Sequence, residues 1–168
     1  NPYLRIRESL MASAYNRLGI MDSSYYYSKI AYHELPGNAK NFEQYIKDIV
    51  QKKDIQALKK TFRESNFKEN YQYWLLYFAS VIKIKDKKDR EIDSFAKIAL
   101  QKFPDNDQLK LISAYILHGE ENIKKSYVLV DQGQKEFAQD KYREASEKFI
   151  EAYRLNPEDY SIIENIGM

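Results

Sequence analysis

The two histidines are the residues of this sequence best suited to bind a metal or to transfer a proton. The pair His33 and Glu34 suggests a metal-binding motif, but a helical metalloprotease motif needs a second histidine four residues after the first, where Gly37 stands. We expect His118 at a helix end, where an imidazolium complements the negative end of the helix dipole. With two histidines and no cysteine, the sequence predicts no dedicated metal site.

Other groups that carry out covalent chemistry do not form recognisable arrangements either. The sequence shows no identifiable Ser-His-acid pattern and no glycine-rich loop that would hold a phosphate. The neighbouring carboxylates of Glu120 and Glu121 fall in a segment that we expect to be a solvated polar link. The sequence therefore predicts no catalytic residue, no bound cofactor and no enzymatic activity.

An aromatic cluster is the best candidate for binding another molecule. It consists of Tyr71, Tyr73, Trp74, Tyr77 and Phe78. Tryptophan and tyrosine often anchor interfaces, because they bury a large area with few rotatable bonds. The alternative is that the cluster fills a core, which is the commoner role of apolar residues at helical spacing.

Composition excludes several classes of partner. The chain of 168 residues is 43% hydrophobic and 31% charged, with only five glycines and four prolines, which favours a mostly helical protein. A formal net charge of +2 is too small to indicate binding to nucleic acid or to an anionic membrane. No apolar run approaches the roughly 20 residues that a membrane-spanning helix needs, so this segment is not expected to insert into a bilayer.

Residues 140–160 carry the clearest pattern in the chain. Ala145, Phe149 and Ala152 lie at positions i, i+4 and i+7, so they share one face of a helix. Pro157 then ends the helix, because it lacks an N–H and disfavours helical backbone at the preceding residue. The pattern predicts a helix with a small, large, small face and a proline stop.

The spacing of the prolines indicates a repeat. Pro36 and Pro104 lie 68 residues apart, which is two periods of 34. A 34-residue period, with the small, large, small face and the proline stop, resembles the tetratricopeptide (TPR) family over nearly the whole chain. The expected repeats cover residues 5–38, 39–72, 73–106 and 126–159, followed by a partial repeat at 160–168. The resemblance implies a single all-α array over residues 1–168, in which antiparallel helix pairs stack into a right-handed superhelix.

Residues 107–125 interrupt this period. A short amphipathic helix is expected over 107–119, inserted between two repeats. A further helix from about residue 123 to 139 then carries Gly133 at the position where a first TPR helix has a small residue. We predict an irregularity near 119–123, in the form of a longer helix, a kink or a change of superhelical direction.

The resemblance also implies a function. First helices of TPR repeats line a concave groove that commonly holds a peptide or a partner helix. The pattern of Lys, Asn and Arg that clamps a C-terminal carboxylate in some TPR proteins is absent here. The groove is expected to suit an amphipathic helix or an aromatic-rich peptide, and the candidate partner-binding residues are Asn16, Arg17, Lys40, Lys47, Trp74, Tyr77, Tyr127 and Gln134.

The last residues predict an incomplete repeat. Gly167 stands where the first helix of a further repeat would have its small residue. A last helix without a neighbour exposes an apolar face. This indicates either a longer chain or coverage by another chain, which includes self-association through the C-terminal helix.

A second resemblance covers residues 17–38. This segment is similar to repeats in the soluble tails of bacterial cell-envelope membrane proteins, including O-antigen polymerase-like ones. It implies an alternative function, in which the segment is a regulatory or assembly tail of a larger envelope glycan-synthesis protein. The compartment is then bacterial cytoplasm or periplasm, with envelope association favoured.

Overall fold

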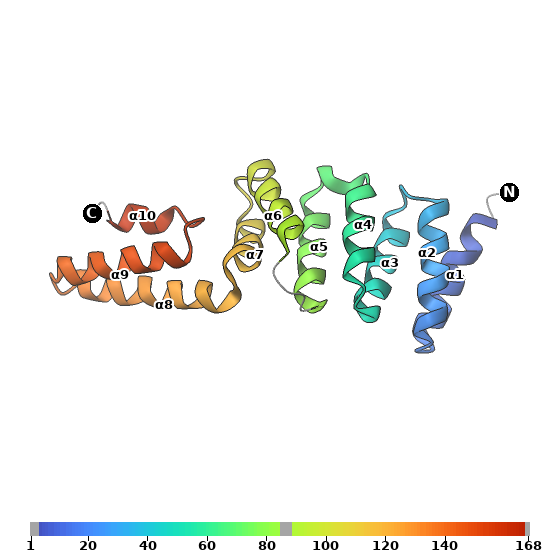
Figure 1. The fold of residues 1–168 in the computed structure, drawn as a ribbon, viewed down its shortest axis with the longest axis horizontal. Coiled ribbons are helices and arrows are strands. Elements are labelled where there is room, and N and C mark those ends of the chain that lie inside the picture. Colours follow the sequence, from blue (N-terminus) through green and yellow to red (C-terminus); the bar gives the residue numbers. More distant parts are fainter. Residues whose placement is uncertain (1–3, 85–88, 167–168) are drawn as a thin grey trace. The chain divides into compact units, whose positions relative to one another are not determined.

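The computed structural model describes residues 4–84 and 89–166, and every regular element in these two ranges is helical (Figure 1). The predicted all-α class is therefore confirmed. The helices of the first range are α1 (Leu4–Arg17), α2 (Met21–Glu34), α3 (Ala39–Lys52), α4 (Ile55–Glu64), the short 3₁₀ helix η1 (Phe67–Glu69) and α5 (Tyr71–Ile84). Those of the second range are α6 (Arg90–Lys102), α7 (Asp107–His118), α8 (Glu120–Phe137), α9 (Tyr142–Leu155) and α10 (Ser161–Ile166).

The chain divides into two compact units, which we call the N-terminal unit (Asn1–Lys87) and the C-terminal unit (Lys88–Met168). This division passes through the predicted repeat at 73–106. Its two helices, α5 and α6, belong to different units, and α6 packs on α7 within its own unit. Pairing of helices depends on contacts between distant residues, which a proline spacing does not report. Across residues 4–84 and 89–166, no helix is long and apolar enough to cross a membrane.

The starts of α3 and α4 in the N-terminal unit are fixed by side-chain caps. Asn38 Oδ1 accepts a hydrogen bond of 3.1 Å from the backbone N–H of Asn41 at the start of α3. Asp54 caps the next helix, α4, by accepting a hydrogen bond of 2.9 Å from the N–H of Ala57. Each cap satisfies a backbone donor that has no partner inside the helix.

Helices of the N-terminal unit pack in chain order, α1 on α2, α2 on α3 and α3 on α4 (Figure 1). In addition, α3 contacts both α1 and α5, so alternate helices also touch. The core between them is aromatic: the Phe62 ring stacks on Tyr77 at a centroid distance of 4.2 Å and meets Trp74 edge-on at 4.9 Å. Stacked and edge-to-face pairs add to the stabilisation from area burial.

A buried carboxylate links three helices of this unit. Asp48 on α3 is 1% exposed and accepts hydrogen bonds from three uncharged side chains. Ser24 Oγ on α2 donates to Asp48 Oδ2 at 2.9 Å, while Gln44 and Asn16 donate to Oδ1 at 3.1 and 3.3 Å. Hydrogen bonding of this kind is what allows a carboxylate to be buried.

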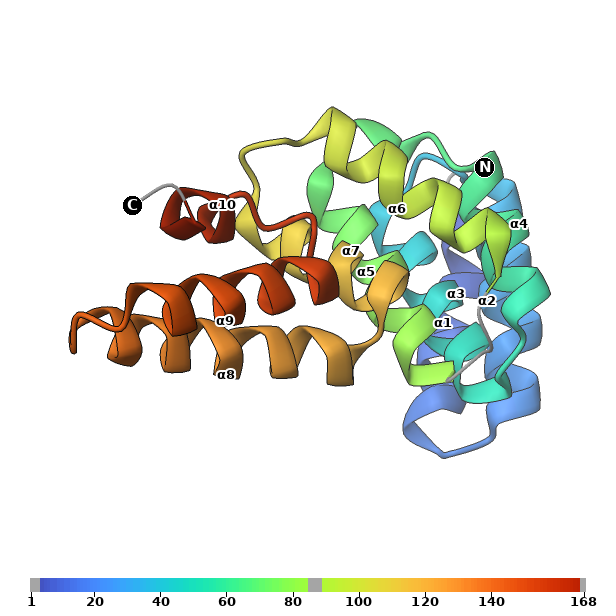
Figure 2. The same cartoon turned by 60° about the vertical axis from the view of Figure 1, so that its left-hand side comes forward.

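The C-terminal unit is built on the pair α8 and α9, which lie side by side in both views (Figures 1 and 2). The predicted face of α9 is buried as expected, with Ala145, Phe149 and Ala152 each at most 2% exposed. Gly133 on α8 meets the Phe149 ring so closely that an added Cβ would lie 2.7 Å from Phe149 Cε1. The small residue expected at position 133 is therefore required by packing.

The irregularity predicted near 119–123 takes the form of a longer helix. A single residue, Gly119 with φ of 88°, separates α7 from α8, and α8 is 18 residues long. The expectations of a polar link at 120–125 and of a helix start near 123 were wrong. Glu120 and Glu121 instead occupy the first turn of α8, where carboxylates complement the positive end of the helix.

The partial repeat predicted at 160–168 contains the short helix α10, which packs on α9 (Figure 2). Ile162 of α10 is 1% exposed and joins the core of the C-terminal unit, whereas Ile163 is 41% exposed. Gly167 lies outside the described residues. Self-association through this helix stays a prediction.

Candidate binding groove

A groove of about 890 Å³ lies in the C-terminal unit and is open to solvent. One wall comes from α6 and α7, and the opposite wall from the connection between α9 and α10. Tyr127 on α8 completes the lining. The lining residues are Lys97, Leu100, Gln101, Pro104, Asp107, Lys110, Leu111, Ala114, Tyr127, Asn156, Glu158, Asp159, Tyr160 and Ser161. A volume of this size is typical of ligand-binding clefts.

Part of the lining is apolar surface that a partner could cover. Leu111 on α7 is 37% exposed and Tyr127 on α8 is 43% exposed, while Ala114 is buried. A partner that covers these leucine and tyrosine side chains removes apolar area from water. This stabilises the complex by about 25 cal/mol per Å² of apolar area. These side chains make the groove suitable for an apolar side chain of a partner.

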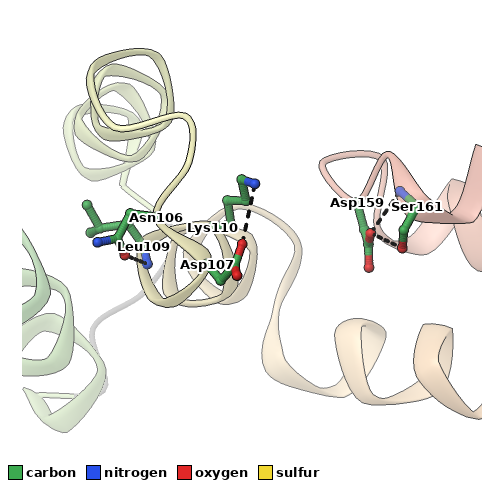
Figure 3. A network of polar contacts seen from close by, with 6 residues as sticks. All are labelled: Asn106, Asp107, Leu109, Lys110, Asp159 and Ser161. Carbon is green, nitrogen blue, oxygen red and sulfur yellow. Dashed lines mark hydrogen bonds and ion pairs between the residues drawn. The ribbon is translucent and has the colours of Figure 1, made fainter.

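The first turn of α7 brings charges to one wall (Figure 3). Asn106 caps this helix by accepting a hydrogen bond of 2.9 Å from the N–H of Leu109. Asp107 and Lys110 then lie one turn apart, with Lys110 Nζ 3.4 Å from Asp107 Oδ1. Because both groups are exposed, this pair contributes little to stability and remains available to a partner.

The connection between α9 and α10 places carboxylates on the opposite wall (Figure 3). α9 ends at Leu155, before Pro157, as the proline stop predicted. Asp159 Oδ1 then accepts hydrogen bonds from the N–H of Ser161 at 3.1 Å and from its hydroxyl at 2.6 Å. Burial raises the pKa of the Tyr127 hydroxyl, and the negative charge of Asp159 adds to this rise.

Asn156 is the buried polar residue of this wall. Its side chain is 2% exposed, and its backbone N–H donates to Ala152 O at 3.0 Å, which closes the end of α9. Its side-chain oxygen, Oδ1, has no hydrogen-bond partner in residues 4–84 and 89–166. A buried acceptor without a donor costs about 1–3 kcal/mol.

His118 lies beside this wall. Its Nε2 atom is 3.7 Å from Glu158 Oε1, which is too long for a hydrogen bond and suits an ion pair only when the imidazole is protonated. His118 is the last residue of α7, as expected. In the part of the chain that the structure describes, no three histidine, aspartate or glutamate residues are grouped so that they could hold a metal ion.

The predicted partner-binding residues of the first three helices differ in accessibility. Arg17, Lys40 and Lys47 are exposed, so they are accessible to a partner. Asn16 is half-buried and donates to Asp48, so its amide is already used inside the N-terminal unit. Its contact with a partner stays a prediction.

Trp74 and Tyr77 were expected to face a groove, and this prediction was wrong. They are 2% and 1% exposed and pack against Phe62 within the N-terminal unit. Trp74 Nε1 also donates to Lys68 O at 2.8 Å, so the indole N–H is satisfied internally. The alternative interpretation, that the aromatic cluster fills a core, holds for these two residues.

Tyr127 and Gln134, the two candidates on α8, differ in position. Tyr127 lines the groove, whereas Gln134 is exposed and does not line it. Sequence reasoning missed the other groove residues, such as Lys97, Lys110 and Asp159. These come from α6, from α7 and from the connection between α9 and α10, and the only local signal was the polar run after Leu155, which was interpreted as a helix stop.

Comparisons with protein-family models, with curated proteins and with solved structures find no match to this chain. The arrangement of the helices and the groove therefore carry the functional argument.

Proposed function

We propose that this chain is a non-catalytic scaffold that binds a peptide or a partner helix in the groove of its C-terminal unit. The observation that carries the proposal is the open groove of about 890 Å³, with apolar and charged groups on its walls. Grooves of this composition suit amphipathic segments, whose apolar side chains enter the groove while polar ones meet its walls.

The TPR resemblance supports the same proposal. The contacts of α3 with α1 and α5 are those expected when first helices of successive repeats lie next to one another. The close approach of Gly133 to Phe149 is the small-against-large packing that the resemblance implies for a TPR helix pair. We therefore propose TPR-like packing, whose fold alone does not choose the ligand.

Binding in the groove can be tested with peptides selected against the whole chain from a displayed random library. The variant Leu111→Arg places a large charged side chain on the groove wall, and we expect it to weaken binding of the selected peptides at least tenfold. Leu111 is partly exposed, so the substitution is expected to leave the fold intact. Titration calorimetry measures the affinity, and circular dichroism verifies the helix content.

Ile98→Arg is the matched control. Ile98 is an exposed apolar residue of α6, 43% accessible, and it does not line the groove. We expect this variant to bind every selected peptide with unchanged affinity. Equal binding by both variants, or a failure to select any peptide, would contradict the proposed function.

A further inference from the structure

We propose that the connection between α9 and α10 recognises a basic side chain, lysine or arginine, of the peptide that occupies the groove. This inference rests on the proposed function and states which chemistry the groove selects. It depends on three groups of one wall: the carboxylates of Glu158 and Asp159 and the buried side-chain oxygen of Asn156.

Glu158 and Asp159 are the two carboxylates of this wall. Neither Glu158 nor Asp159 pairs with a lysine or an arginine in residues 4–84 and 89–166, and Glu158 has only His118 at 3.7 Å. Asp159 uses its Oδ1 atom on Ser161, and no hydrogen bond of its Oδ2 atom is seen in those residues. The wall therefore has negative charge that a partner can neutralise.

Asn156 provides the independent observation. Asn156 lines the groove, and its Oδ1 atom is buried and has no donor in the described part of the chain. A guanidinium or an ammonium group carries several donors, so a single basic side chain can serve this oxygen and a neighbouring carboxylate together. Hydrogen bonds to an ionised group are about twice as strong as neutral ones.

A metal ion is the less suitable occupant of this wall. Divalent cations such as Ca²⁺ take six or more oxygen ligands, and the described residues hold no cluster of three candidate acidic or histidine ligands. The neighbouring surface favours a peptide, because Leu111 and Tyr127 offer apolar contacts beside the carboxylates. On the α6 side, Lys97 would repel a basic side chain and so direct it toward Asp159.

The experiment uses the full chain and two matched probes, Nα-acetyl-arginine N-methylamide and its uncharged analogue Nα-acetyl-citrulline N-methylamide. Binding is followed by ¹H–¹⁵N correlation spectra. We expect the arginine probe to shift the amide signals of Asn156, Asp159 and Ser161, and to bind at least fivefold more tightly than the citrulline probe. Added salt should weaken the arginine complex, because exposed charges are screened.

Substitutions that remove the negative charge but keep the size of the side chain test whether this wall binds the arginine probe. Asp159→Asn keeps an oxygen that can cap α10, since asparagine is as good a cap as aspartate, and Glu158→Gln is its partner substitution. The double variant is expected to lose at least four fifths of the preference for arginine over citrulline. Glu144→Gln, an exposed residue of α9 outside the groove, should leave the preference unchanged.

The outcomes separate this inference from the proposed function. The inference is overturned if the two probes bind equally, if their shifts map away from the α9–α10 connection, or if the double variant keeps the preference. Peptides that bind through Leu111 without needing a basic residue would leave the proposed function standing while removing this inference. A chain that selects no peptide removes both.

Discussion

At the scale of single residues, Asp48 shows how a charged group becomes part of a core. Serine, glutamine and asparagine side chains from two other segments and from its own helix supply its hydrogen bonds, in place of a lysine or an arginine. Asn16 was expected to contact a partner, and this internal role was not visible in the sequence. The TPR resemblance implied that Asn16 lies in the groove, but a resemblance does not show which internal group a side chain meets.

Removing this carboxylate is expected to destabilise the N-terminal unit. Asp48→Ala removes the acceptor of two amides and leaves the buried Ser24 hydroxyl only its longer bond to Ala12 O, which we expect to lower the free energy of unfolding by about 2–4 kcal/mol. Urea unfolding followed by Trp74 fluorescence measures the change. Glu43→Ala, on the exposed side of α3, is the control and should shift stability by less than about 0.5 kcal/mol. Equal losses in both variants would show that the network contributes nothing specific.

At the scale of elements, the close approach of α8 and α9 depends on Gly133, which has no side chain to meet the Phe149 ring. A methyl group at position 133 would lie 2.7–3.0 Å from three atoms of the Phe149 ring. A glycine inside a helix costs roughly 1 kcal/mol relative to alanine. The close packing of the two helices has to offset that cost.

Gly133→Ala is therefore expected to lower stability, although alanine is the better helix former. We expect a net loss of up to about 2 kcal/mol, because overpacking typically costs 1–3 kcal/mol and the higher helix propensity of alanine offsets roughly 1 kcal/mol of it. Thermal unfolding by circular dichroism measures it. The double variant Gly133→Ala with Phe149→Leu should recover part of the loss, by giving the methyl group room. Gly37→Ala, where an added Cβ meets nothing within 4 Å, is the neutral control.

Helix positions were largely predictable from the sequence, whereas the pairing of α6 with α7 was not. The face of Ala145, Phe149 and Ala152 and the helix stop at Pro157 depend on residues within one or two turns, so local patterns suffice. The start of α8 was missed because the carboxylates of Glu120 and Glu121 suit a solvated link and a first helical turn equally well. The groove was missed because its two walls come from segments far apart in the chain.

At the scale of the whole molecule, the chain has two compact units, each with a core of its own. Phe62 lies in the N-terminal core beside Trp74, and Phe149 lies in the C-terminal core. Trp74 is the one tryptophan of the sequence, so its fluorescence reports on the N-terminal unit alone.

Two matched substitutions are expected to affect different signals. Phe62→Ala should lower the denaturation midpoint seen by Trp74 fluorescence, with a loss of about 3–5 kcal/mol, while Phe149→Ala should leave that midpoint in place. Circular dichroism should detect the loss caused by Phe149→Ala, because both units are helical. Parallel shifts of the fluorescence midpoint in the two variants would mean that the chain unfolds as one cooperative body.

The single residue between α7 and α8 makes the groove sensitive to insertions and deletions. Each residue of an α-helix turns the next side chain by about 100°. Gly119 alone leaves almost no loop to absorb a change in length, so an added or lost residue would rotate α8 about its axis. Tyr127 would then leave the groove lining. We therefore expect related chains to keep the length of this junction constant, even where the residues around it differ.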